Sequence, residues 1–287
     1  MHYSSLEIGV PASIGAALLL STGTLLQALD ARLVSHGHGM RVSLLGRLLR
    51  RRRWVAGTAV GYLAFPLQLV ALAHAPLVLV QPVHACGLIL LLLAGSRLLR
   101  EPVRGPELAG AFMILAGLAV VTWGAPGGSD RPVSEPALAG AVALLVALAL
   151  IPYVSRDRCG RLPLIFSAAL GFAGANMAVK GVSVTIASHH FLLAAGYLGA
   201  AALGSTVAVL SQMTAFQRYR AGEVVPLTFS IPTFLPALLG LLVLQQRWGT
   251  AVLGGVPFAI GATLLLLGAA VVARSAPVTR VARQVSG

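Results

Sequence analysis

The chain has 287 residues, of which 57% are hydrophobic and 10% are charged, and its mean hydropathy is +0.87. A soluble domain carries roughly 25% charged residues, so this composition excludes a water-soluble globular protein and favours a chain that resides in a lipid bilayer. The net charge of +13 does not indicate nucleic-acid binding, because the arginines lie in short segments between apolar runs, as membrane topology requires.

Nine apolar runs follow one another along the chain, and each is long enough to cross the membrane as a helix of about 20 residues. The sequence therefore predicts an all-α, polytopic membrane helix bundle with nine transmembrane helices, in a single transmembrane domain over residues 1–287. Several runs contain proline, which a membrane bundle tolerates because neighbouring helices satisfy the freed carbonyl groups. The runs are residues 8–29, 54–73, 76–97, 106–124, 136–154, 164–187, 191–216, 224–245 and 251–273.

The arginines predict the orientation of the bundle, since cytoplasmic loops of membrane proteins are rich in basic residues. With nine spans, 18 arginines fall on one side and two, Arg131 and Arg247, on the other. We expect the N-terminus outside, residues 274–287 as a cytoplasmic tail, and the chain in the plasma (inner) membrane of a bacterium. The arginines of the cytoplasmic side are Arg32, Arg41, Arg47, Arg50, Arg51, Arg52, Arg53, Arg97, Arg100, Arg104, Arg156, Arg158, Arg161, Arg218, Arg220, Arg274, Arg280 and Arg283.

The segment 30–53, between the first two runs, is long for a loop and mixes leucine with arginine. Such a segment forms either a short helix in the membrane interface or an ordinary basic loop, and the sequence leaves both alternatives open.

An internal repeat with an offset of 144 residues divides the chain into a first half of four spans, residues 8–124, and a second half of five, residues 136–273. The offset places three glycines at seven-residue spacing on three others. Such glycines predict seams at which helices pack closely, either within one chain or in a homodimer through the spans 106–124 and 251–273. The glycines are Gly110, Gly117 and Gly124, and their counterparts Gly254, Gly261 and Gly268.

A second pattern links the second and seventh spans, in which small residues and one glutamine recur with the same helical spacing. Because these spans cross the membrane in opposite directions, the two halves are predicted to be inverted repeats, as in many secondary transporters. Chance matching of abundant glycine and alanine is the alternative. The two sets are Gly57, Gly61, Ala64 and Gln68, and Ala201, Ser205, Ala208 and Gln212.

The segment 71–121 resembles the EamA-type half-repeat of the drug/metabolite transporter superfamily, and residues 215–272 resemble it in degenerate form. The shared pattern is a helix opening near proline, a short loop with Glu101, and a Gly-rich helix. The usual member of the superfamily has ten helices as five plus five, whereas this chain has four plus five. "GANMAVKGVS" (174–183) and "QMTAFQRYRAGEVVPLTF" (212–229) are similar to the NIPA-like branch, which implies magnesium transport.

The interiors of the nine spans contain no aspartate or glutamate. Magnesium sites normally use carboxylate oxygens, so this absence argues against a divalent cation as the solute. All the acidic residues lie at span ends or in loops: Glu7, Asp30, Glu101, Glu107, Asp130, Glu135, Asp157 and Glu223.

Lys180 is the only lysine and the only charged residue well inside a span. An ionisable group at such depth indicates function, and a cationic cavity without carboxylates would suit an anionic or zwitterionic metabolite. The alternative is that Lys180 extends its amine to the outer membrane interface. Further residues at comparable depth are predicted to line the same polar, substrate-binding cavity: Asn176, Ser183, His84, Ser205, Tyr62, Ser21 and Thr233.

Four residues at symmetry-related places are predicted to act in gating or packing. Gln68 and Gln212 lie near opposite membrane faces, where amides form hydrogen bonds between helices. Pro82 and Pro226 are predicted to open or bend their helices.

The pattern as a whole predicts a secondary transporter that moves a small polar or anionic/zwitterionic metabolite by alternating access. Magnesium transport is one alternative, and a non-transporting membrane partner protein is another. The expected partners are the lipid bilayer and a small-molecule or ion substrate, with no nucleic acid. No motif indicates an enzyme, a bound metal or a cofactor.

Overall fold

The computed structural model describes residues 3–34, 41–74, 83, 86–98, 104–124, 134–154, 160–243 and 252–274. All regular structure in these ranges is helical and no strand occurs among them, which confirms the predicted all-α class. The elements are α1 (Tyr3–Arg32), α2 (Val42–Leu48), α3 (Arg52–His74), α5 (Gly87–Leu98), α6 (Gly105–Gly124), α7 (Glu135–Val154), α8 (Arg161–Ala187), α9 (Phe191–Arg218), α10 (Ala221–Val243), η3 (Val252–Gly255) and α11 (Val256–Arg274).

Seven of these helices, α1, α3, α6, α7, α8, α9 and α11, are long and apolar enough to cross a membrane. The described part of α5 is a shorter apolar helix, and α10 has 23 residues. Pro66 lies inside α3 and Pro226 inside α10, so these prolines do not end their helices. Each predicted apolar run overlaps one of the seven long helices, α5 or α10, and the length and composition of the seven fit a multi-pass membrane protein.

Large apolar side chains cover much of the outer surface of the bundle. Leu192 is 88% exposed, Phe191 66% and Leu266 63%. Contiguous apolar surface is unfavourable in water but is the surface that lipid requires, because the hydrocarbon core offers no partner for polar groups.

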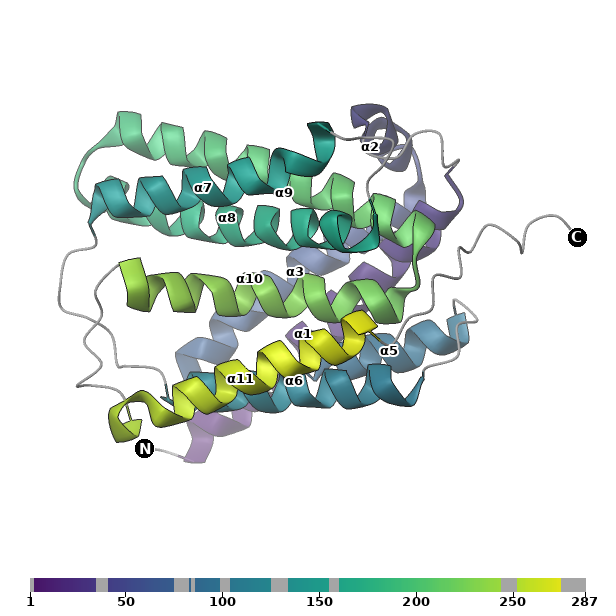
Figure 1. The fold of residues 1–287 in the computed structure, drawn as a ribbon, viewed down its shortest axis with the longest axis horizontal. Coiled ribbons are helices and arrows are strands. Elements are labelled where there is room, and N and C mark those ends of the chain that lie inside the picture. The colour runs from purple at the N-terminus through teal and green to yellow at the C-terminus, as the bar shows by residue number, and fades with distance from the viewer. Residues whose placement is uncertain are drawn as a thin grey trace, which may run out of the picture.

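The helices run side by side along the long axis of the molecule (Figure 1). α7, α8 and α9 lie together on one side, α6 and α11 on the opposite side, and α10 lies between them. α1 and α3 pack extensively against each other, as do α8 and α9, and α6 and α11. The molecule is therefore built around three close helix pairs.

The predicted glycine seams bring α6 and α11 into contact. A Cβ atom added to Gly117 would lie 2.7 Å from the carbonyl oxygen of Gly261, and one added to Gly261 would lie 2.7 Å from that of Gly117. Gly110 meets Gly268 in the same way, at 2.8 and 2.7 Å. As the residue number rises along α6 it falls along α11, so the two helices are antiparallel. The seam is thus filled within one chain.

The other two close pairs use the same device. A Cβ atom added to Gly23 of α1 would lie 2.5 Å from the carbonyl oxygen of Gly57 in α3. A Cβ atom added to Gly171 of α8 would lie 2.8 Å from the carbonyl oxygen of Gly204 in α9, and one added to Gly204 would lie 3.0 Å from that of Gly171. Small residues allow backbones to come this close, which strengthens van der Waals packing between helices in lipid.

All the arginines that the structure describes lie at one end of the bundle, called the basic end below. They occupy α2 and the adjoining ends of the other helices, and several interactions join these ends. Arg161 at the start of α8 contacts Glu223 at the start of α10 and the carbonyl oxygen of Ala273 at the end of α11. Gln217 at the end of α9 donates to the carbonyl oxygen of Val34, just after α1. The described arginines thus gather at one end, while Arg131 and Arg247, which are predicted to lie on the other side, fall outside the described residues.

The basic segment 30–53 contains a helix, α2, rather than only a loop. Leu44 and Leu48, four residues apart, are fully buried against the bundle, while Arg47 between them is exposed. The mixture of leucine and arginine in this segment thus reflects a helix with one buried face.

Candidate functional site

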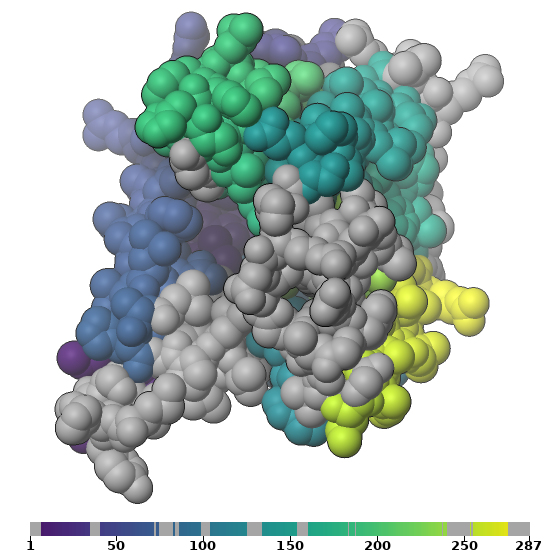
Figure 2. Space-filling model, turned by 90° about the vertical axis from the view of Figure 1, so that its left-hand side faces the viewer, coloured from purple at the N-terminus to yellow at the C-terminus, as the bar shows by residue number. Residues whose placement is uncertain are grey.

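A cavity of about 670 Å³ lies between the two halves of the chain. Residues from α1, α3 and α5 of the first half and from α8, α9 and α10 of the second half line it, and α2 adds Leu45 and Leu49. Figure 2 shows a recess between the surfaces of α3 and α9, with α1 at its base, on the end of the bundle at which α1 begins. The cavity therefore has one wall from each half.

Six of the predicted site residues line this cavity, so the fold brings together side chains from five helices. They are Ser21, Tyr62, Asn176, Ser205, Gln212 and Thr233. Ser21 also joins two of the helices, since its hydroxyl lies 2.7 Å from the carbonyl oxygen of Ala17 in α1 and 2.8 Å from that of Gly87 in α5. The bond to α5 is possible because residue 87 is glycine: a Cβ atom there would lie 2.8 Å from the Ser21 oxygen.

Three predicted residues lie elsewhere. Lys180 is exposed and does not line the cavity, although it follows Asn176 by one helical turn on α8. Gln68 is half-buried on α3 and Pro226 is buried in α10, and neither lines the cavity. His84, Pro82 and the side chain of Ser183 fall outside the described residues.

Sequence reasoning missed several polar residues of the cavity wall. These are Thr24 and Gln27 of α1, Trp54 and Thr58 of α3, Thr206 of α9 and Thr228 of α10. A threonine can face lipid in a membrane helix, because its hydroxyl can donate to a carbonyl oxygen of the preceding turn. A threonine within a span is therefore compatible with a lipid-facing position as well as with a cavity wall, and the sequence does not distinguish the two.

Aromatic side chains complete the wall. Trp54, Tyr62, Phe172 and Phe229 line the cavity together with leucines and valine. None of the described lining residues is aspartate, glutamate, lysine, arginine or histidine. Within the part of the chain that the structure describes, no group of three or more histidine, cysteine or acidic residues is arranged to hold a metal ion. The described wall is thus polar through hydroxyls and amides only.

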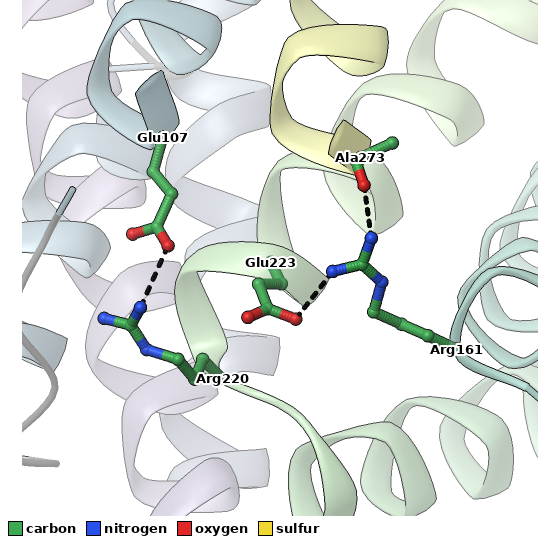
Figure 3. Close-up of polar contacts among 5 residues, drawn as sticks. All are labelled: Glu107, Arg161, Arg220, Glu223 and Ala273. Carbon is green, nitrogen blue, oxygen red and sulfur yellow. Dashed lines mark hydrogen bonds and ion pairs between the residues drawn. The ribbon is translucent and has the colours of Figure 1, made fainter. Parts of the chain in front are cut away.

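The basic end carries three ion pairs that the sequence did not predict: Arg51 lies 3.9 Å from Asp30, and Figure 3 shows the other two. Arg220, just before α10, lies 3.1 Å from Glu107 in the first turn of α6, and Glu107 is only 1% exposed. Arg161 lies 3.0 Å from Glu223 and also donates to the carbonyl oxygen of Ala273. These contacts hold together the ends of α6, α8, α10 and α11.

A third acidic residue joins the ends of α1 and α3. Asp30 in the last turn of α1 is 3% exposed and accepts a hydrogen bond of 2.9 Å from the backbone N–H of Trp54. This N–H is among the first of α3 and has no partner within its own helix, so Asp30 caps α3 from a neighbouring element. The indole of Trp54 in turn donates to the sulfur of Met213 in α9, at 3.3 Å.

Glu223 has competing influences on its charge. It lies in the first turn of α10, at the basic end and just before the apolar run 224–245. Burial raises the pKa of its carboxyl above the ordinary value, and the hydrogen bond and charge of Arg161 oppose this shift. Arg161, with a smaller contribution from the charge of Arg220, therefore favours an ionised Glu223 at this position.

Comparison of the chain with family models, curated proteins and solved structures gave no match. Chemically, a cavity with hydroxyls, amides and aromatic faces can bind a small polar solute through hydrogen bonds, with apolar contacts around it.

Proposed function

We propose that the chain is a secondary transporter of the drug/metabolite transporter type, in which nine spans form two inverted halves and move a small polar solute by alternating access. The observation that carries the proposal is the cavity of about 670 Å³ lined by α1, α3 and α5 on one side and by α8, α9 and α10 on the other. Under the 144-residue repeat these helices correspond in order, so each half contributes the same three elements. Transporters with inverted repeats bind their substrates at such an interface.

The pairing of the helices also supports inverted halves. α1 packs on α3 in the first half, and their counterparts α8 and α9 pack on each other in the second. α6 and α11, the last helices of the two halves, are antiparallel through Gly117 and Gly261. Two copies that run in opposite directions across the membrane require this relation.

The clustering of arginine supports an orientation with the basic end in the cytoplasm and the N-terminus outside, since cytoplasmic loops carry the basic excess. A plasma membrane of a bacterium is the location that we propose. A homodimer through the spans 106–124 and 251–273 would have to use faces other than the glycine seam, because that seam is occupied by contacts between α6 and α11.

The solute is the least defined part of the proposal. An anionic or zwitterionic metabolite was expected because of Lys180, and Lys180 does not line the cavity. Magnesium, the alternative that the NIPA-like resemblance implies, would meet no carboxylate among the described lining residues, and hydrated Mg²⁺ gives up water reluctantly. A small polar organic solute that needs neither an ammonium group nor a carboxylate from the cavity wall is therefore favoured over both. Magnesium flux into proteoliposomes that cobalt inhibits would favour the alternative.

Accessibility of a cavity cysteine from the two sides of the membrane tests alternating access. Ser205→Cys, in a chain whose two native cysteines are replaced by serine, is exposed to a membrane-impermeant thiol reagent in right-side-out and inside-out vesicles. A transporter is modified from both sides, because the cavity opens to each in turn. Leu203→Cys is the control, since Leu203 is 48% exposed and does not line the cavity; it faces lipid and stays unmodified. Modification of Ser205→Cys from one side only would rule out transport and favour a non-transporting membrane partner protein.

A further inference from the structure

Eight hydroxyl groups lie in the cavity wall, and most of them share the direction of their hydrogen bonds. Six of them donate to a backbone carbonyl oxygen of their own helix, at 2.7 to 3.0 Å. A carbonyl oxygen can only accept, so each hydroxyl must be the donor. The six are Ser21, Thr24, Thr58, Thr206, Thr228 and Thr233.

A hydroxyl has one proton and two lone pairs. Because the proton of each of these six hydroxyls is already hydrogen-bonded, they can act toward a solute only as hydrogen-bond acceptors. Two further donors of the wall are also engaged. The indole N–H of Trp54 donates to Met213, and the amide nitrogen of Gln27 donates to the hydroxyl of Thr58 at 3.0 Å.

Proline adds acceptors on α10. Pro232 has no N–H, so it cannot donate to the carbonyl oxygen of Thr228, four residues earlier, and Pro236 cannot donate to that of Pro232. Thr228 and Pro232 both line the cavity. The wall formed by α1, α3, α5 and α10 is therefore rich in acceptors. Some lining groups can still donate: the amides of Asn176 and Gln212 and the hydroxyl of Ser205 on α8 and α9, the hydroxyl of Tyr62 on α3, and the second amide N–H of Gln27 on α1.

We propose that the cavity selects a small organic amine in its ammonium form, whose N–H groups donate to the hydroxyl oxygens of α1, α3 and α10 while its apolar body contacts the aromatic side chains. An anionic solute would face lone pairs on most of the wall. A divalent cation would lose far more hydration energy than a monovalent one, without a carboxylate to replace it. A monovalent ammonium gains both from acceptor oxygens and from the faces of Trp54, Tyr62 and Phe229.

This inference rests on the proposed function only in taking the bound amine as the transported solute, and binding can be measured without transport. The probes are benzylammonium, benzyltrimethylammonium, benzoate and Mg²⁺, each added to the purified full chain in detergent and followed by equilibrium dialysis. Benzylammonium and benzyltrimethylammonium carry the same charge and ring, but only the first has N–H donors. We expect benzylammonium to bind at least tenfold more tightly than each of the others, since one hydrogen bond to a charged group is worth about that factor.

Two variants locate the binding. Thr24→Val and Thr233→Val remove one acceptor from each half of the wall while they keep the branched shape of the side chain. Thr263→Val on α11 is the matched control, because Thr263 makes the same bond to a carbonyl of the preceding turn, at 2.9 Å, but does not line the cavity. We expect each cavity variant to weaken benzylammonium binding at least fivefold and the control to change it less than twofold.

The outcomes are distinct from those of the cysteine experiment. Equal or tighter binding of benzyltrimethylammonium or benzoate, equal effects of all three variants, or no binding of benzylammonium overturns the amine inference. If Ser205→Cys is at the same time modified from both sides, the transporter proposal stands and only its solute is wrong.

Discussion

The contact between Gly117 and Gly261 at the centre of the α6–α11 seam makes a quantitative prediction for Gly117→Ala. The new Cβ atom would lie 2.7 Å from the carbonyl oxygen of Gly261 and 2.7 Å from the backbone nitrogen of Leu265. Ordinary contact begins near 3.4 Å, so α11 must retreat by about 0.7 Å. Both neighbours are backbone atoms, and no side-chain rotation can relieve the overlap.

The size of the effect follows from two opposing contributions. Overpacking of a close-packed site costs about 1–3 kcal/mol, while replacing glycine by alanine inside a helix gains up to about 1 kcal/mol. The variant should therefore lose about 1–2 kcal/mol. At roughly 2–4 °C of melting temperature per kcal/mol for a chain of this size, the expected decrease in Tm is about 2–8 °C.

Gly140→Ala on α7 is the control, because a Cβ atom there would meet nothing within 4 Å. We expect this variant to be as stable as the parent chain or slightly more stable. Thermal unfolding of both variants in the same detergent, followed by circular dichroism, gives the comparison. If Gly117→Ala is as stable as Gly140→Ala, the close approach of α6 and α11 is refuted, and with it the assignment of the seam to contacts within one chain.

Three further predictions concern charge and orientation. Arg161→Gln removes the main group that opposes the raised pKa of Glu223 and leaves only the weaker influence of Arg220; the protonated carboxyl is then favoured more in the folded state, so we expect Tm to be lower at pH 8 than at pH 5, with the parent chain changing less. Lys180→Ala should leave benzylammonium binding within twofold, because Lys180 does not line the cavity; a larger loss would assign it to the site. With Cys86 replaced by serine, Cys159 should react with an impermeant maleimide in inside-out vesicles only, and labelling in intact cells would reverse the proposed orientation.

The fold was largely predictable because a membrane helix must satisfy its own backbone and carry apolar side chains over its whole length. Each apolar run accordingly became part of a helix, even in α10 with three prolines in its interior. The partner of each helix was harder to predict. The seven-residue spacing of Gly110, Gly117 and Gly124 indicates a close helix contact. Glycines carry no side chain, however, so their spacing does not specify which helix packs against them.

The cavity was predictable in part. Depth in the membrane, which the helix rise of 1.5 Å per residue fixes, predicts Ser21, Asn176 and Thr233 as cavity residues. Depth does not fix the direction in which a residue faces, and it equally predicts Lys180, which lies outside the lining. The number of polar residues at a given depth is thus readable from sequence, whereas their orientation depends on packing.

The ion pairs of the basic end could not be derived from sequence. Glu107 and Arg220 are 113 residues apart, and Arg161 and Glu223 are 62 apart. Arg97, Arg100 and Arg104 precede Glu107, and Arg218 and Arg220 precede Glu223, so several pairings are equally compatible with the sequence. Only the arrangement of the helix ends selects among them.

Under the 144-residue repeat that we propose, Gly117 corresponds to Gly261, so the contact between these two glycines is its own counterpart. If the proposed halves exchange shapes to turn the cavity from one side of the membrane to the other, a contact between residues that do not correspond, such as Gly110 with Gly268, is replaced by its counterpart. The contact between Gly117 and Gly261 is replaced by itself. It can serve as a stationary pivot for the exchange, and the absence of side chains there lets two backbones turn against each other without a rotamer having to change.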